Sequence, residues 1–146
     1  MKNFYLRYLI LFAALLASIN MYGQNKNVLT ILQNKDWMLQ NSPVLRYYDV
    51  IERFSSTEFI QTMVYEGKEY SIKSPYYLSD SIPTSFEHQK VGKVQNGKYV
   101  IGLFTRKDGE GGQYKEMVAY EILEMTDQYL KKKNLQSAIV LEFKAK

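Results

Sequence analysis

The sequence predicts an all-β protein, an antiparallel up-and-down meander of roughly eight to ten strands closed into a barrel, with a short N-terminal helix. Short β-rich runs recur at 8–12-residue spacing, each bounded by turn residues. Two glycine turns, Glu66-Gly67-Lys68 and Asn96-Gly97, have the composition of tight hairpin connections. Closure into a barrel is the most economical way to leave no strand edge bare.

The first 23 residues have the layout of a secretory signal peptide. Lys2 and Arg7 give a positive start, residues 8–19 form an apolar run, and polar residues 24–27 follow. That run is too short to span a bilayer comfortably, which favours a cleaved signal peptide. The alternative is a retained N-terminal anchor. We expect cleavage after Gly23, which leaves residues 24–146 as one domain exported to the periplasm or beyond the cell.

Composition restricts what the exported domain can be. The chain has no cysteine, so disulfides, thiolate metal sites and lipoprotein anchoring are all excluded. Loss of Lys2 and Arg7 leaves 17 basic against 15 acidic side chains, too balanced for a nucleic-acid surface. The only basic run, residues 131–133, is interpreted as a solvated strand end.

The N-terminal part of the domain predicts a short helix and two strands. Apolar positions in residues 25–34 follow a helical stripe of one or two turns. Residues 35–39 indicate a brief first strand that carries Trp37, the only tryptophan. Residues 48–54 indicate a second strand, with Tyr48, Val50 and Phe54 on one face.

The middle of the chain predicts two hairpins. Residues 58–65 and 69–74 flank the Gly67 turn, and residues 76–81 follow Pro75 as a further short strand that Pro83 ends. Residues 86–95 and 98–106 would form the second hairpin around Asn96-Gly97. Residues 107–113, with three glycines, are predicted to be an exposed loop.

The stretch from Tyr120 to Lys133 fits either a helix or a hairpin. As a helix, Ile122, Met125 and Tyr129 share a stripe. As a hairpin, residues 117–125 run to a turn at 126–128 and residues 129–134 return. The hairpin is favoured because Thr126 and Asp127 are turn residues and because strands flank the stretch on both sides, residues 139–143 alternating after it.

The layout resembles the lipocalin-like, or calycin, proteins that certain bacteria export. The matching features are the short helix, the long meander, and the strand bearing Trp37, where lipocalins place the tryptophan of their Gly-x-Trp motif. Residues 120–130 are also similar to the Y-x-I-x-x-L-T-x-x-x-L strand–turn–strand of bacterial relatives. Lys35-Asp36 replaces the glycine that usually precedes the tryptophan, so the resemblance is to a bacterial lipocalin-like branch. It implies binding of a small hydrophobic or amphipathic molecule inside the barrel.

No catalytic or metal-binding pattern is visible. His88 is the only histidine and is expected at the surface or rim. Residues 109–112 lack the lysine and the following helix of a phosphate-binding loop. We therefore expect neither an enzyme nor a bound cofactor or metal.

Aromatic side chains are the candidates for a ligand site, because tyrosine offers apolar area with an orienting hydroxyl. The alternative is that they simply fill a packed barrel. Trp37 would lie near the closed base, and Arg53 and Arg106 could meet a carboxylate. The candidate ligand-binding residues are Trp37, Arg53, Phe59, Met63, Tyr99, Ile101, Tyr120 and Ile122.

The sequence thus predicts a non-enzymatic exported protein that binds a small hydrophobic ligand, with no nucleic-acid partner and no transmembrane segment after cleavage. The alternative is a protein-interaction module, such as a periplasmic inhibitor, immunity protein or accessory subunit. In that case the core is packed, and residues 107–113 and 79–85 carry the contacts.

Overall fold

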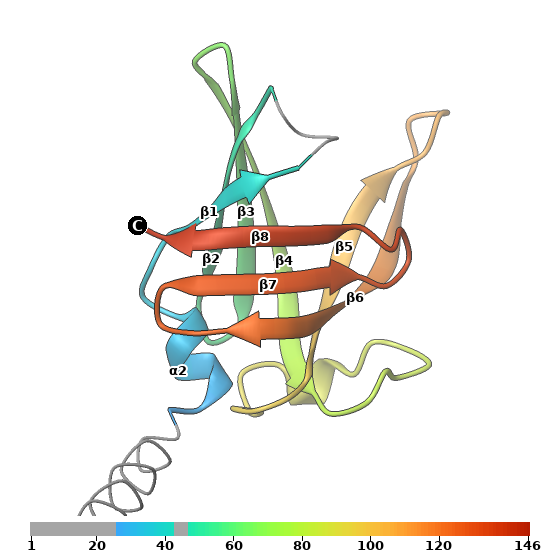
Figure 1. Cartoon of the computed structure of the whole chain (residues 1–146). Helices are drawn as coiled ribbons and strands as arrows, with labels where there is room; N and C mark the ends of the chain where they lie inside the picture. The colour runs from blue at the N-terminus through green and yellow to red at the C-terminus, as the bar shows by residue number, and fades with distance from the viewer. Residues whose placement is uncertain (1–25, 43–46) are drawn as a thin grey trace, which may run out of the picture.

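The computed structural model describes residues 26–42 and 47–146, and the predicted signal peptide and cleavage site lie outside them. Eight antiparallel strands follow one another around a closed barrel in meander order, which confirms the predicted fold class (Figure 1). No helix in these residues has the length and apolar character that crossing a membrane requires. The elements are α2 (Val28–Leu32), β1 (Trp37–Asn41), β2 (Asp49–Phe54), β3 (Glu58–Tyr65), β4 (Lys68–Ser79), the 3-10 turn η1 (His88–Lys90), β5 (Tyr99–Lys107), β6 (Gln113–Met125), β7 (Tyr129–Asn134) and β8 (Val140–Ala145).

The ambiguous stretch is a hairpin, as predicted. β6 and β7 pair on either side of a turn at residues 126–128, and the Thr126 backbone N–H donates to the Tyr129 carbonyl at 2.8 Å. The Thr126 hydroxyl also accepts from the backbone N–H groups of Gln128 and Tyr129. A threonine that satisfies turn amides in this way explains why the chain reverses here instead of continuing as a helix.

One end of the barrel is plugged by α2. The helix is capped by Asn27, whose side-chain oxygen accepts from the Thr30 backbone N–H at 2.7 Å. The indole Nε1 of Trp37 donates to the Leu32 carbonyl at 2.9 Å, and both residues are fully buried. Trp37 therefore lies at the closed end, and the hairpin tips of β3–β4 and β5–β6 lie at the other end (Figure 1).

The predicted hairpin around Asn96-Gly97 is wrong. Residues 80–98 contain only η1 and cross the closed end as a loop. Their polar groups cap the helix: the Leu29 backbone N–H donates to the Gln95 carbonyl, and the Val28 N–H donates to the Asn96 side-chain oxygen, each at 3.0 Å. These are N–H groups of the first helical turn, which have no partner within a helix. Tertiary capping therefore overrides a strong local turn signal.

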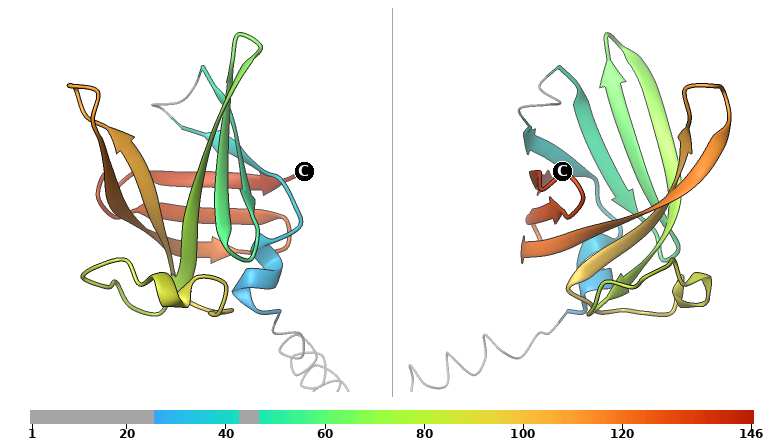
Figure 2. Two further views of the ribbon diagram at one scale, coloured as in Figure 1. Left: turned by 180° about the vertical axis from the view of Figure 1, so that it is seen from behind. Right: turned by 90° about the vertical axis from the view of Figure 1, so that its right-hand side faces the viewer.

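β4 is also longer than predicted. It runs without interruption through Pro75, so residues 69–74 and 76–79 belong to one strand and not to two. Beyond this point the barrel wall divides, because β4 and β5 pair only through residues 76–79 and 99–102. The β3–β4 and β5–β6 hairpins diverge above that pairing (Figure 2).

The buried apolar residues form two clusters on opposite sides of the barrel wall. The larger fills the interior and includes Trp37, Phe54, Phe59 and Phe143. The smaller consists of Tyr77, Ile101 and Ala119, with half-buried side chains of the 80–98 loop packed against it. This loop covers the outer face of β4, β5 and β6, which explains why both faces of β5 are apolar in sequence.

We predict that Gly97→Ala destabilises the fold, because an added Cβ would lie 2.5 Å from the Ser79 backbone nitrogen. Overpacking of this kind costs about 1–3 kcal/mol, measurable as the free energy of unfolding in urea. Gly109→Ala is the matched control, since no atom lies within 4 Å of its added Cβ. Equal stability of the two variants would contradict the close approach of the 80–98 loop to β4.

Candidate functional site

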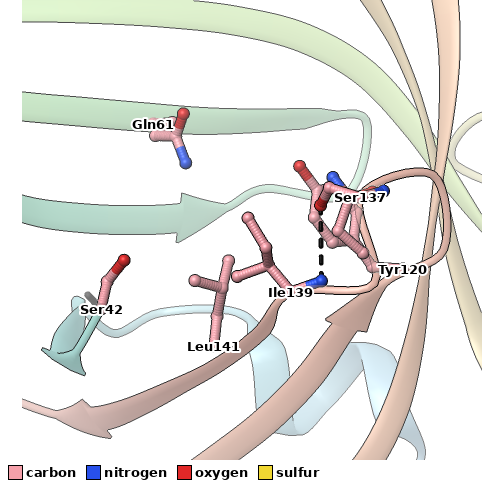
Figure 3. A pocket seen from close by; sticks show the side chains of 7 residues that line it. Ser42, Gln61, Tyr120, Ser137, Ile139 and Leu141 are labelled. Carbon is pink, nitrogen blue, oxygen red and sulfur yellow. Dashed lines mark hydrogen bonds between the residues drawn. The ribbon is translucent and has the colours of Figure 1, made fainter. Parts of the chain in front are cut away.

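A pocket of about 170 Å³ opens at the end of the barrel away from α2. β3, β6, β7, β8 and the loop between β7 and β8 all contribute to it, and Ser42 follows β1. The side chains of Ile139 and Leu141 extend toward the carboxamide of Gln61 (Figure 3). The lining residues are Ser42, Gln61, Tyr120, Asn134, Ser137, Ile139 and Leu141.

The loop between β7 and β8 is held by its own polar groups. The Asn134 side-chain oxygen accepts from the backbone N–H groups of Gln136 at 2.9 Å and Ser137 at 3.1 Å. Ala138 has a φ of 59°, which is unusual for a residue other than glycine, and the Gln136 side chain anchors the loop to the Met117 carbonyl at 3.0 Å. This rim of the pocket is therefore a defined structure rather than a loose connection.

A buried ion pair lies beneath the pocket. The Lys132 ammonium is 2.5 Å from the Glu52 carboxylate, and both side chains are fully buried. The other oxygen of Glu52 accepts a hydrogen bond from the Gln61 carboxamide at 3.2 Å. Because Gln61 also lines the pocket, it links the pocket directly to the buried pair.

Aromatic rings surround the ammonium group of Lys132. Its nitrogen lies 4.2 Å from the ring centroid of Tyr120, 4.8 Å from Phe59, 5.2 Å from Phe143 and 5.7 Å from Phe54. Such contacts favour a cation through the ring quadrupoles. Burial nevertheless lowers the pKa of Lys132, and the Glu52 carboxylate opposes that shift.

Tyr120 belongs to both the pocket and this aromatic cage. Burial raises the pKa of its phenol, and the nearby Glu52 carboxylate adds to the rise. Tyr120 therefore keeps its proton throughout the physiological pH range. A neutral hydroxyl can both donate and accept a hydrogen bond, which makes Tyr120 suited to orienting a polar group in the pocket.

Glu52 and Lys132 are the site residues that sequence reasoning missed. The expectation that Lys132 belongs to a solvated strand end is wrong. Lys131 points outward and pairs with Glu142, whereas Lys132 alternates inward with the buried Leu130. A usable signal existed on β2, where Glu52 occupies the inward-facing position between Val50 and Phe54. A charge at such a position predicts a buried partner.

The structure separates the eight residues predicted to bind ligand. Tyr120 lines the pocket, Phe59 lies under it beside Lys132, and Ile122 packs against the interior cluster. Met63 is half-buried on the face of β3 that also carries Gln61. Trp37 lies at the opposite, closed end.

The remaining three candidates lie outside the barrel interior. Tyr99 and Ile101 belong to the cluster beneath the 80–98 loop, on the opposite side of the barrel wall from Tyr120, so they do not line the interior with it. Arg53 alternates outward from Glu52 and donates two hydrogen bonds to Asp36. It lines a separate hollow of about 280 Å³ at the closed end with Asn34, Lys35, Asp36, Phe54 and Ser55.

Arg106, by contrast, lies on the inner face of the upper wall. It is two residues beyond Phe104, its guanidinium is 5.2 Å from the Phe104 ring centroid, and its Nε donates to Glu116 at 2.9 Å. Tyr70 of β4 pairs with Met63 of β3, and Tyr114 of β6 pairs with Arg106 of β5. Both tyrosines are about half exposed. The inner surface above the pocket therefore carries aromatic side chains together with the Arg106–Glu116 ion pair.

Comparisons with known proteins give no assignment: no protein-family model, curated protein or solved structure matches this chain. Within residues 26–42 and 47–146, no group of three or more histidine or acidic side chains could hold a metal ion. His88 packs edge-on against Phe86, with ring centroids 4.9 Å apart.

We predict that breaking the buried ion pair is costly and that replacing it whole is not. Lys132→Met leaves a buried carboxylate without its partner, which costs about 3–5 kcal/mol of unfolding free energy. The double variant Glu52→Met with Lys132→Met should recover most of that loss, because both charges are then removed. Urea unfolding of Glu52→Met, Lys132→Met and the double variant measures the coupling free energy between the two side chains.

Lys131→Met, which breaks the partly exposed pair with Glu142, is the control and should change stability by less than about 1 kcal/mol. A Lys132→Met protein as stable as the parent would show that the interior pair does not form.

Proposed function

We propose that this protein is a non-enzymatic, exported binding protein that holds a small amphipathic molecule in the pocket at the open end of its barrel. The carrying observation is a preformed pocket whose floor is fixed by a buried ion pair. A binding site of this kind needs no rearrangement to accept a ligand, which reduces the cost of association. The export component of the proposal is supported by the signal-peptide layout of residues 1–23.

The pocket volume limits the size of the ligand. About 170 Å³ is close to the roughly 150 Å³ of an engineered protein cavity that binds one benzene molecule. Below it, the interior is filled by Lys132 and its aromatic neighbours. The best-fitting ligand is therefore a compact molecule of about one ring, because a long acyl chain would find the barrel centre occupied.

The pocket walls favour an amphipathic ligand. Ile139 and Leu141 offer apolar contact on one side, while Gln61, Tyr120 and Ser137 offer hydrogen-bonding groups on the others. Apolar walls supply affinity, and a few positioned polar groups supply orientation.

A protein-binding function draws support from a different feature, the divided wall between β4 and β5.

Ligand-observed ¹⁹F NMR with a pool of fluorinated one-ring alcohols and amides tests the proposal. The ¹⁹F resonance of at least one compound in the pool should broaden on addition of the mature protein. Leu141→Trp should abolish this broadening, because the larger side chain fills the pocket. Leu123→Trp is the control, because Leu123 is exposed on β6 and does not line the pocket.

Binding that survives Leu141→Trp would place the ligand elsewhere. A pool in which no member binds to the folded parent would overturn the small-molecule proposal.

A further inference from the structure

Two strand edges are left unpaired where the barrel wall divides. β4 and β5 pair only between residues 76–79 and 99–102. In the part of the chain that the structure describes, Lys68–Pro75 pairs only with β3, and Leu103–Lys107 pairs only with β6. Each of these segments therefore turns a row of backbone N–H and C=O groups toward the gap between the hairpins.

The division follows from the sequence. Pro75 lies next to Tyr76, the last β4 residue that pairs with β5, and it has no backbone N–H to continue the ladder. Beyond the paired residues the two hairpins separate in both views of Figure 2. The free edges are thus a built feature of this barrel and not the result of a missing strand elsewhere.

Side chains beside the free edges are spaced to receive alternate residues of an extended chain. Tyr70 and Ile72 lie on the inner face of β4, and Phe104 and Arg106 lie on the inner face of β5. Successive residues on one face of a strand are separated by about 7 Å, the spacing at which an added strand presents its own side chains. Tyrosine and arginine are also the residue types most enriched where proteins bind one another.

The free edges carry a net positive charge. Lys68 and Lys73 on β4 and Arg106 and Lys107 on β5 outnumber the single acidic residue, Glu69. Arg106 is paired with Glu116 from β6, but Lys68, Lys73 and Lys107 have no ion-pair partner among residues 26–42 and 47–146. This excess repels a second copy of the same edge and complements an acidic segment.

We propose that the gap between β4 and β5 is a docking site for an extended, acidic polypeptide segment of a partner protein, which adds as a strand to the free edge of β4. Main-chain hydrogen bonds to β4 supply affinity. Apolar residues of the segment contact Tyr70 and Ile72, which are exposed and half-buried respectively, and its carboxylates meet Lys73 and Lys107. This function is independent of the small-molecule pocket, whose lining contains none of these residues.

Fluorescence polarisation with a labelled nonapeptide of alternating aspartate and valine tests the proposal on the mature protein. The peptide should bind saturably. A version N-methylated at alternate residues keeps its side chains but loses main-chain donors, and should bind at least about tenfold more weakly, as should the lysine–valine analogue. Hydrogen exchange should slow at backbone amides within residues 69–74.

Matched charge variants test whether the peptide binds at the free edges or elsewhere on the surface. Lys73→Glu with Lys107→Glu should weaken binding about tenfold by reversing the complementary charge. Lys144→Glu, on the exposed face of β8, should leave it unchanged, and so should the pocket-filling Leu141→Trp.

Equal binding of the N-methylated peptide would overturn strand addition. Absence of saturable binding by the acidic peptide, or association of the protein with itself through residues 69–74, would overturn the proposed partner.

Discussion

The ion pair between Glu52 and Lys132 is the constraint on which the barrel interior depends. It joins β2 to β7 across 80 residues of sequence and lies where water does not reach. A one-residue slip of either strand would turn its charged residue outward and leave the other charge alone in the core. The pair thus favours a single register of the strands in the barrel wall. Apolar packing alone would specify that register less strictly. Four aromatic rings and the carboxamide of Gln61 complete its surroundings.

This interior divides the barrel into three levels with different physical roles. α2 and Trp37 seal one end, and the hydrogen bond from the indole to Leu32 fixes the plug. The charged and aromatic centre fills the middle. The upper level remains open, where β7 and β8 lie below the tips of the longer hairpins (Figure 1). The proposed ligand pocket around Gln61 and Tyr120 and the divided wall above it both belong to this level.

The sequence predicts the strands well where alternation and local turns agree. β3, β7 and the turn at residues 126–128 have their predicted bounds, because Thr126 and Gly67 satisfy the turns locally. It fails where a distant element decides the outcome. Asn96 caps α2 instead of making a hairpin, and Ile101 is covered by a loop that no periodicity reveals. The site was found only in part. Tyr120 followed from its aromatic character, whereas Lys132 was assigned to a solvated strand end, and Glu52 was not singled out although it shares the predicted face of Val50 and Phe54.

The measurement that tests the central claim most directly is a protein-observed NMR titration of isotopically labelled residues 24–146 with a one-ring alcohol that binds them. A ligand seated above the buried ion pair should shift the side-chain amide of Gln61 and the methyl groups of Ile139 and Leu141, and should leave the Trp37 indole unchanged. Shifts confined to the closed end, around Asp36 and Arg53, would contradict a binding site that rests on the Glu52–Lys132 pair.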